Sequence, residues 1–278
     1  MRAALGDELG GPASSYRCDA ADHQAARAGS CGRALPIIRE VDRKMATFAL
    51  IHGGGDVGWY WHLVEAELRA CGHEGVAPDL PSDDDSADLH DYADTVVDAV
   101  GDRSDLVVVG QSYGAFTAAL VADRLRAQAL VLVAGMIPAP GEAAADWWDN
   151  TGYRQAVEEQ ARRDGGRTGS DDPFVAFYHD VPRALAEEAL SKERSESQAA
   201  YHSPWPLEAW PDVPTRFVLC TEDRFFPPAF MRKVASTRLG VTPDEIAAGH
   251  CVALSRPKEL AGLLVSCAVG ERGSEQRP

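Results

Sequence analysis

The segment from Leu106 to Ala115, LVVVGQSYGA, constrains the fold more than any other part of the chain. A run of β-branched residues ends at Gly110, Ser112 follows two residues later, and Gly114 comes two residues after the serine. An alanine-rich amphipathic segment then runs from Phe116 to Leu125, so the pattern predicts a strand, a sharp turn and a helix. The G-x-S-x-G spacing is that of a nucleophile elbow, in which a strained serine is raised above the edge of a sheet. We therefore predict that Ser112 is a nucleophile.

The physics of such an elbow requires both glycines. Side chains at Gly110 or Gly114 would collide with the neighbouring strand and helix. The turn also leaves the amide of Tyr113 at a helix N-terminus, where it can donate to a developing oxyanion. The alternative is a strand-to-helix turn with a chance serine, and the buried strand before it and the helix after it favour the elbow.

From Met45 onward the chain alternates strand and helix patterns. This alternation is typical of a parallel sheet with helices on both faces. We expect strands near residues 47–51, 73–78, 106–109, 129–133, 216–220 and 244–247, and helices near residues 59–70, 89–100, 116–125, 228 onward and 257–269.

The predicted core consists of residues 45–137 and 211–270, and residues 138–210 interrupt the alternation. This middle segment has helical patterns and many aromatic residues, and we predict a cap inserted over the carboxyl edge of the sheet; the aromatic residues are Trp147, Trp148, Phe174, Phe177, Tyr178, Trp205 and Trp210. Residues 1–44 lack apolar periodicity and the apolar core of a signal peptide, so we interpret them as a disordered extension. Met45 directly precedes the first predicted strand and is a natural alternative start for translation. Residues 271–278 form a polar tail that we expect to fray.

Charge and cysteine usage exclude several classes of function. The formal net charge of −16 opposes binding to nucleic acid or to an anionic membrane surface. No apolar run approaches the roughly 20 residues that span a bilayer. The six cysteines show no metal-ligand spacing, and the acidic run at 82–86 lacks the spacing of a calcium-binding loop. We therefore expect a cytoplasmic protein with reduced thiols, no cofactor and no metal.

A serine nucleophile needs a base and a group that orients the base. His250 lies in the sequence AGHC after the last predicted strand, and Asp223 follows the strand that ends near Cys220. Glu222 competes with Asp223 for the role of the acid, and we favour Asp223 because residues nearest a strand end tend to point away from the site. The order serine, acid, histidine along the chain predicts a triad of Ser112, Asp223 and His250.

A glycine-rich turn, His52-Gly53-Gly54-Gly55, follows the first predicted strand. An ester-cleaving site needs a second backbone donor opposite Tyr113, and glycines let the main chain approach the carbonyl. We predict Gly54 as that donor and Gly53 as the residue that shapes the loop, with His52 in a structural role. The alternative for this segment is a flexible turn at the end of a strand.

These motifs together resemble the plant methylesterase and hydroxynitrile lyase branch of the α/β-hydrolase superfamily and its bacterial relatives. The resemblance extends over residues 47–269, is loose in the cap, and rests on FALIHGGGDVGWYW (48–61), VVVGQSYG (107–114), LVLVAGMIPAPGE (130–142), VLCTEDR (218–224) and AGHCVALSRPKEL (248–260). It implies an α/β-hydrolase fold with about six parallel strands, and it favours Asp223 as the acid.

Two departures from this branch bear on the reaction. The lyases carry a threonine after the first-loop histidine and a lysine after the catalytic histidine, whereas this chain has Gly53 and Cys251. An uncharged thiol cannot stabilise a leaving cyanide, so we predict a serine esterase for a small to medium carboxylic ester. Gln111 also replaces a histidine that is common in this branch, and this replacement leaves the substrate open.

Two alternatives remain open at the level of sequence. One is another reaction at the same site, such as a lyase or a step that tailors a secondary metabolite. The other is a non-catalytic ligand-binding receptor on the same fold. The predicted partner is a small-molecule ester, with no nucleic acid and no membrane, and a homodimer is left open.

Overall fold

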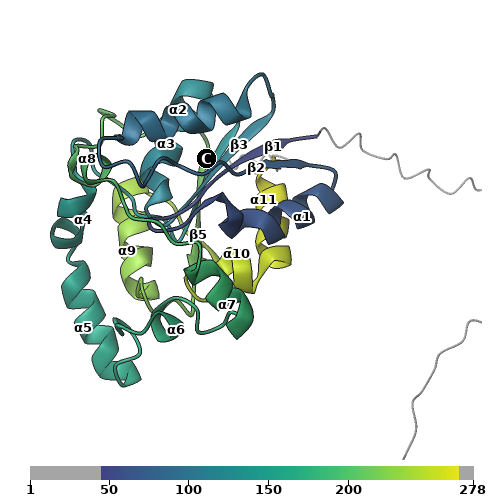
Figure 1. Cartoon of the computed structure of the whole chain (residues 1–278). Helices are drawn as coiled ribbons and strands as arrows, with labels where there is room; N and C mark the ends of the chain where they lie inside the picture. The colour runs from purple at the N-terminus through teal and green to yellow at the C-terminus, as the bar shows by residue number, and fades with distance from the viewer. Residues whose placement is uncertain (1–44, 269–278) are drawn as a thin grey trace, which may run out of the picture. The chain divides into compact units, whose positions relative to one another are not determined.

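The sheet at the centre of the fold has six strands, all parallel, in the order β2-β1-β3-β4-β5-β6 (Figure 1). The computed structural model describes residues 45–268, and the predictions for residues 1–44 and 271–278 lie outside the described residues. The strands are β1 (Thr47–Ile51), β2 (Glu74–Val76), β3 (Leu106–Gln111), β4 (Ala129–Val133), β5 (Thr215–Cys220) and β6 (Asp244–Ile246). The predicted α/β fold with about six parallel strands is confirmed.

Alternate side chains of the central strands enter two separate cores. Val108 and Leu130 pack with one layer of helices, whereas Val107 and Val131 pack with the opposite layer. The first layer is α2 (Leu89–Val100), α3 (Gly114–Leu125) and α9 (Pro228–Leu239); the second is α1 (His62–Ala70), α10 (Val252–Ser255) and α11 (Pro257–Ala268). Because both faces are covered, the strands read as continuous apolar runs in the sequence.

The helix predicted near residues 59–70 starts differently from the expectation. A 3₁₀ turn, η1 (Gly58–Trp61), precedes α1, which begins at His62. The backbone at Gly58 approaches the Ala77 carbonyl so closely that a Cβ there would overlap the oxygen. The 3₁₀ turn is thus packed tightly against the segment after β2 at its first residue, Gly58.

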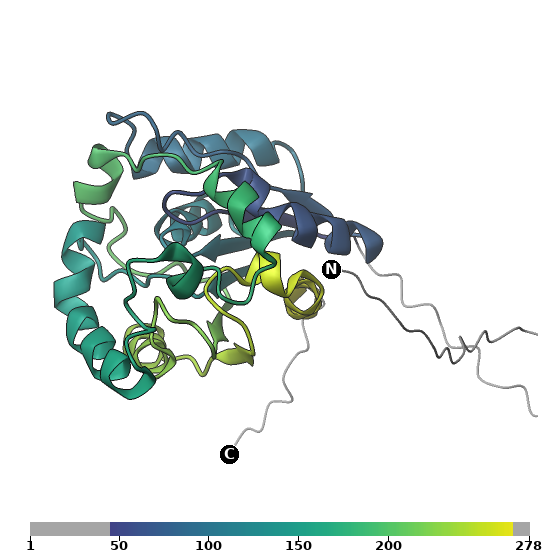
Figure 2. The same ribbon diagram turned by 60° about the horizontal axis from the view of Figure 1, so that its bottom comes forward.

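The segment between β4 and β5 contains helices and no strand among its described residues. Its helices are α4 (Ala144–Thr151), α5 (Tyr153–Asp164), α6 (Pro173–Ala176), α7 (Arg183–Leu190) and α8 (Gln198–His202). In Figure 1 they run along the left and the bottom of the view, and Figure 2 brings them forward. Two buried tryptophans anchor the segment, since Trp147 Nε1 donates to Ile137 O at 3.0 Å and Trp205 Nε1 donates to Phe116 O at 3.1 Å.

Candidate active site

The turn after β3 holds Ser112 in the left-handed region of the backbone map, with φ of 50°. Its amide donates to Val133 O at 3.1 Å, and its carbonyl accepts from Met136 N at 2.9 Å. These bonds join the turn to the end of β4 and to the segment that follows. A strained φ at a non-glycine residue is typical of functional turns, and here it raises the serine above the carboxyl edge of the sheet.

Both glycines of the turn lie against neighbouring atoms. A Cβ at Gly110 would lie 2.6 Å from the Ala118 Cβ and 2.8 Å from the Gly114 carbonyl oxygen. A Cβ at Gly114 would overlap the His52 carbonyl oxygen. Glycine is therefore required at both positions for β1, β3 and α3 to pack as they do.

Asp223 and His250 form a buried pair at the ends of β5 and β6. His250 Nδ1 lies 2.8 Å from Asp223 Oδ2, and both side chains are buried. The other carboxylate oxygen, Asp223 Oδ1, accepts from the amides of Phe225 at 2.8 Å and Phe226 at 2.9 Å. These bonds fix the carboxylate so that the imidazole Nδ1 donates to it, which leaves Nε2 as the nitrogen that can accept a hydrogen bond or a proton.

The competing carboxylate, Glu222, is exposed. Its backbone carbonyl accepts from His179 Nε2 at 3.0 Å, and the amide of Gly249 donates to Asp180 Oδ2 at 2.8 Å. These bonds hold the two loops that carry Asp223 and His250 against the segment between α6 and α7. Glu222 thus contributes its backbone to the loop, and Asp223 is the carboxylate at the imidazole.

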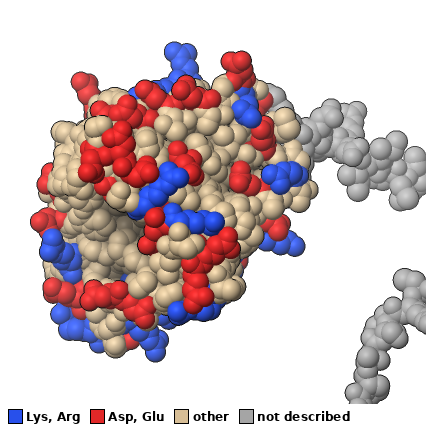
Figure 3. Space-filling model, viewed as in Figure 1, with Lys and Arg blue, Asp and Glu red and all other residues tan. Residues whose placement is uncertain are grey.

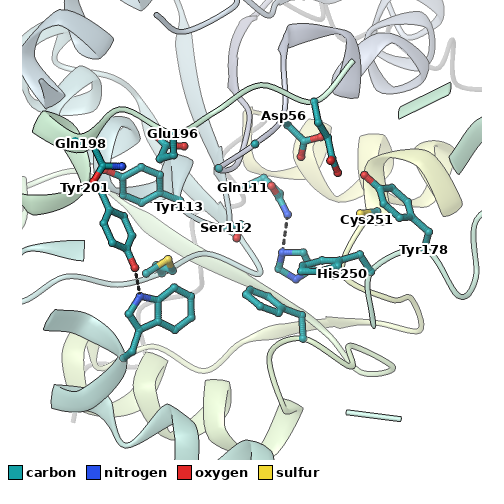
Figure 4. Close-up of a pocket in the computed structure, with 17 residues that line it drawn as sticks. Asp56, Gln111, Ser112, Tyr113, Tyr178, Glu196, Gln198, Tyr201, His250 and Cys251 are labelled. Atoms are coloured by element: carbon teal, nitrogen blue, oxygen red, sulfur yellow. Dashed lines mark hydrogen bonds between the residues drawn. The ribbon is translucent and has the colours of Figure 1, made fainter. Parts of the chain in front are cut away.

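Gln111 bonds to the histidine of the site, a role that we did not predict for it. Its side-chain Nε2 lies 3.1 Å from His250 Nε2, as the dashed line in Figure 4 shows. With Nδ1 donating to Asp223, the imidazole Nε2 accepts this bond. Among the described residues the Ser112 hydroxyl has no hydrogen-bond partner, although Ser112 and His250 line the same cavity. In this structure His250 Nε2 is thus bonded to Gln111 and not to the serine of the predicted triad.

The glycine turn after β1 lies next to Ser112 and Tyr113. A Cβ at Gly53 would lie 3.1 Å from the Ser112 Cβ, and one at Gly54 would lie 3.7 Å from the Tyr113 Cβ. Within residues 45–268, the amides of Gly54 and Tyr113 have no hydrogen-bond partner. Free backbone N–H groups on two adjoining turns are the kind of donor from which an oxyanion hole is built.

His52 belongs to the support of this turn. Its Nδ1 donates to Gly53 O at 2.9 Å, and its Nε2 accepts from Leu80 N at 3.1 Å. Burial lowers the pKa of His52 to about 4, so the ring is neutral near pH 7. This geometry fits the structural role that we expected for His52.

Ser112, Tyr113 and His250 line one cavity of about 370 Å³. Helices and loops between β4 and β5 supply four aromatic residues to its wall, Trp148, Phe177, Tyr178 and Tyr201. Other aromatic residues of that segment, including Trp147 and Trp205, are buried in the core instead. Hydrophobic patterning does not separate these two groups, because both are large apolar side chains on short helices.

The cavity wall also carries carboxylates that the sequence analysis did not single out. Asp56, Glu193 and Glu196 all line it, and Glu196 Oε1 accepts from Tyr92 OH at 2.7 Å. Burial raises the pKa of Asp56 to about 7, with the neighbouring Glu193 adding to the shift and His250 opposing it. Burial also raises the pKa of Cys251, which keeps this thiol neutral at the cavity wall.

The chain belongs to the alpha/beta hydrolase family, whose family model matches residues 48–263. Norfluorocurarine synthase 1 from a Strychnos species is 23% identical over 261 residues, which cover 80% of this chain and 94% of that protein. Esterase PIR7B from Oryza sativa subsp. japonica is 26% identical over 256 residues, covering 80% of this chain and 95% of the rice protein. The crystal structure of polyneuridine aldehyde esterase superposes with a TM-score of 0.66 at 19% identity, covering 80% of this chain and 99% of that one. The predicted resemblance to plant esterases of this fold is confirmed.

Three further observations concern the described residues alone. No helix in the part from 45 to 268 combines the length and the apolar character needed to cross a membrane. The cysteines Cys71, Cys220, Cys251 and Cys267 are free thiols. In the same part of the chain, no three His, Cys, Asp or Glu side chains gather so that they could hold a metal ion.

Proposed function

We propose that this protein is a serine hydrolase that cleaves a small to medium carboxylic ester through Ser112, His250 and Asp223. The observation that carries the proposal is the buried Asp223–His250 pair, 2.8 Å apart, whose histidine lines one cavity with Ser112, a serine in a strained turn. The esterase relatives support the same chemistry.

In the proposed mechanism, His250 accepts the hydroxyl proton as Ser112 Oγ attacks the ester carbonyl carbon. The amides of Gly54 and Tyr113 stabilise the oxyanion, each contributing on the order of 10²–10³ in rate. His250 then gives the proton to the leaving alcohol, while Asp223 stabilises the imidazolium. Water, deprotonated by His250, attacks the acyl-enzyme, the bond between the acyl carbon and Ser112 Oγ breaks, and His250 returns the proton to Oγ as the carboxylic acid leaves.

Gln111 has to release His250 before this sequence can begin. The imidazole Nε2 accepts one strong hydrogen bond, and the Gln111 amide occupies it in the present structure. Catalytic hydrogen bonds commonly form only when substrate is bound. We therefore place the exchange of Gln111 for Ser112 at the substrate-binding step.

A lyase reaction on the same site fits less well. Cyanide release needs a cation near the leaving group, and Cys251 stands where the lyases carry lysine. Among the described residues, no lysine or arginine lines the cavity. Carboxylates near the site oppose a departing anion, so ester hydrolysis is the reaction that we retain. We also propose a cytoplasmic location for the protein, and a homodimer remains an alternative to a monomer.

The test is hydrolysis of p-nitrophenyl esters from acetate to octanoate by the parent and by Ser112→Ala. We expect turnover in the parent and a loss of about 10⁴-fold or more in kcat for the variant. The preferred chain length then measures the depth of the cavity. A parent as inert as Ser112→Ala would contradict the esterase proposal and favour the ligand-binding receptor.

A further inference from the structure

We propose that the cavity recognises esters whose alcohol part carries an alkylammonium cation, held between Asp56 and Glu193 beside the Tyr178 ring. This inference rests on the proposed function and names its substrate class. It starts from the acidic wall of the cavity and from an acceptor atom that has no partner there.

The charges around the cavity all have one sign. Asp56, Glu193 and Glu196 line it, and no described lysine or arginine does. The cations nearest in sequence lie in the same segment as the two glutamates but are engaged elsewhere. Arg194 pairs with Asp79 at 2.8 Å, and Lys192 lies 3.5 Å from Glu188 and over the Trp59 ring; these residues belong to the segment between α7 and α8.

This segment is fixed against the glycine turn. The amide of Arg194 donates to the Gly55 carbonyl at 3.0 Å, next to Asp56 in the chain. Glu193 therefore lies near Asp56, and its charge raises the pKa of that carboxyl further. Two neighbouring carboxylates without a counter-ion repel each other, and a bound cation would remove that repulsion.

An independent feature of Gln111 adds negative potential in the same place. Gln111 is 1% exposed, its Nε2 bonds to His250, and its Oε1 has no hydrogen-bond partner. In Figure 4 the Gln111 side chain lies between His250 and Asp56. A buried carbonyl oxygen without a partner is unfavourable by about 1–3 kcal/mol, and a cation nearby would offset part of this through its attraction to the carbonyl dipole. Oε1 lies against Gly53, out of reach of a hydrogen bond from the cavity, so this attraction acts on ammonium groups with or without an N–H.

The aromatic wall adds a second attraction. Tyr178 lines the cavity with Asp56 and Glu193, and both carboxylates help to raise the pKa of its hydroxyl after the effect of burial. Tyr178 is therefore close to both. An alkylammonium group over an aromatic ring gains cation–π attraction, which increases when the pair is shielded from water.

The position of this subsite selects the alcohol part of the ester. His250 protonates the leaving alkoxide in the proposed mechanism, so the alcohol has to lie against its Nε2. Asp56 is close enough to His250 for the two groups to influence each other electrostatically. A cation beyond the leaving oxygen thus falls between Asp56 and Glu193, whereas the acyl group faces the side of Tyr113 and Tyr201.

The decisive experiment compares choline butyrate with 3,3-dimethylbutyl butyrate, which has the same shape and no charge. We expect kcat/KM to favour the cationic ester by roughly 10- to 100-fold at low salt. The double variant Asp56→Asn, Glu193→Gln should bring the ratio to between about 1 and 3. The matched control, Asp98→Asn with Glu158→Gln, removes the same net charge at two exposed positions and should keep the parent's ratio.

Equal kcat/KM for the two butyrates in the parent would overturn the inference while leaving the esterase proposal intact. A ratio that falls equally in the control variant would also overturn it, because net charge alone would then explain the preference. A second pair, methyl 4-(trimethylammonio)butyrate and methyl 5,5-dimethylhexanoate, carries the charge on the acyl part. A larger preference in this pair would overturn the placement on the alcohol side.

A binding measurement separates this inference from the proposed function. Choline should raise the Tm of Ser112→Ala, and neutral 3,3-dimethylbutanol at the same concentration should raise it less. The effect of choline should disappear when Asp56→Asn and Glu193→Gln are added. Absence of any choline effect would contradict the cation subsite even if p-nitrophenyl esters are cleaved, and its presence would support the subsite even if they are not.

Discussion

Ser112 has an unfavourable backbone conformation that neighbouring hydrogen bonds hold in place. Its φ of 50° places a β-carbon in the left-handed region, which is unfavourable by about 1–2 kcal/mol for residues other than glycine. The hydrogen bonds to Val133 and Met136 hold this conformation. The strain therefore belongs to the geometry that exposes the hydroxyl, and glycine would relieve it only with loss of the nucleophile.

We expect Ser112→Gly to be more stable than Ser112→Ala by about 1 kcal/mol, since only the alanine keeps a Cβ at positive φ. Denaturant unfolding of both variants measures the difference. Both lack the hydroxyl, so any difference in stability reports the backbone and not the catalytic group. Identical midpoints for the two would show that the turn is not strained.

Residue-level chemistry also explains what was missed. The sequence does not reveal the role of Gln111, because its contact with His250 joins residues 139 positions apart. Asp56 and Glu193 resemble ordinary loop carboxylates in the sequence. Their common location becomes visible only when the segment after α7 lies against the turn after β1.

At the scale of elements, the junction of β1, β3 and α3 depends on two glycines. The start of α3 passes the end of β1 so closely that Gly114 has no room for a side chain. The G-x-S-x-G spacing predicts that glycine is required at this position. It does not identify the atom that excludes a side chain, the His52 carbonyl oxygen, because that contact depends on how β1 and α3 pack. The helix α3 itself is almost entirely buried, which its alanine-rich sequence permits.

We expect Gly114→Ala to destabilise the fold by about 3 kcal/mol or more, because the new methyl overlaps backbone atoms that cannot move without shifting β1. Gly262→Ala is the matched control. Gly262 lies inside α11 with open space at its Cβ position, so alanine there should stabilise by about 0.5–1 kcal/mol. Thermal unfolding of the two variants should show shifts of opposite sign, and a tolerated Gly114→Ala would contradict the packing argument.

At the scale of the whole described chain, a buried ion pair joins the segment that walls the cavity to the sheet layers. It is the pair of Glu142 with Arg238 on α9, in which Glu142 is 7% exposed. Glu142 also accepts from Ala139 N at 2.9 Å and from Asn150 Nδ2 at 2.8 Å. Acidic side chains are spread over the face in Figure 3, and this pair differs from them because it is shielded from water.

The pair makes stability depend on pH. Burial opposes ionisation of Glu142, but the hydrogen bonds from Arg238, Ala139 and Asn150 prevail and lower its pKa below the ordinary value of 4.5. A carboxyl whose pKa is lower in the folded state stabilises the fold above its ordinary pKa. That stabilisation is lost as the pH falls through the folded pKa.

We expect Glu142→Gln to destabilise by about 2 kcal/mol at pH 7 and by progressively less as the pH drops below 4.5, the ordinary value. Glu187→Gln removes an exposed helical pair with Arg183 and should change stability by at most about 0.5 kcal/mol at either pH. Urea unfolding between pH 3.5 and pH 7 provides the comparison. A difference that does not vary with pH would mean that Glu142 acts through shape alone.

Local patterns in the chain were enough to predict the six strands, most helices that cover them and their order. Apolar runs such as 129–133 and the G-x-S-x-G turn are local signals, since side-chain period and turn chemistry act within a few residues. The order of Ser112, Asp223 and His250 can likewise be read directly from the chain. Which side chains share the cavity depends instead on how distant segments pack together. Asp56 and Glu193 come from two loops and Gln111 from the end of β3, all far apart in sequence. They meet because parallel strands bring their carboxyl ends to one edge of the sheet and the segment after α7 folds back over it.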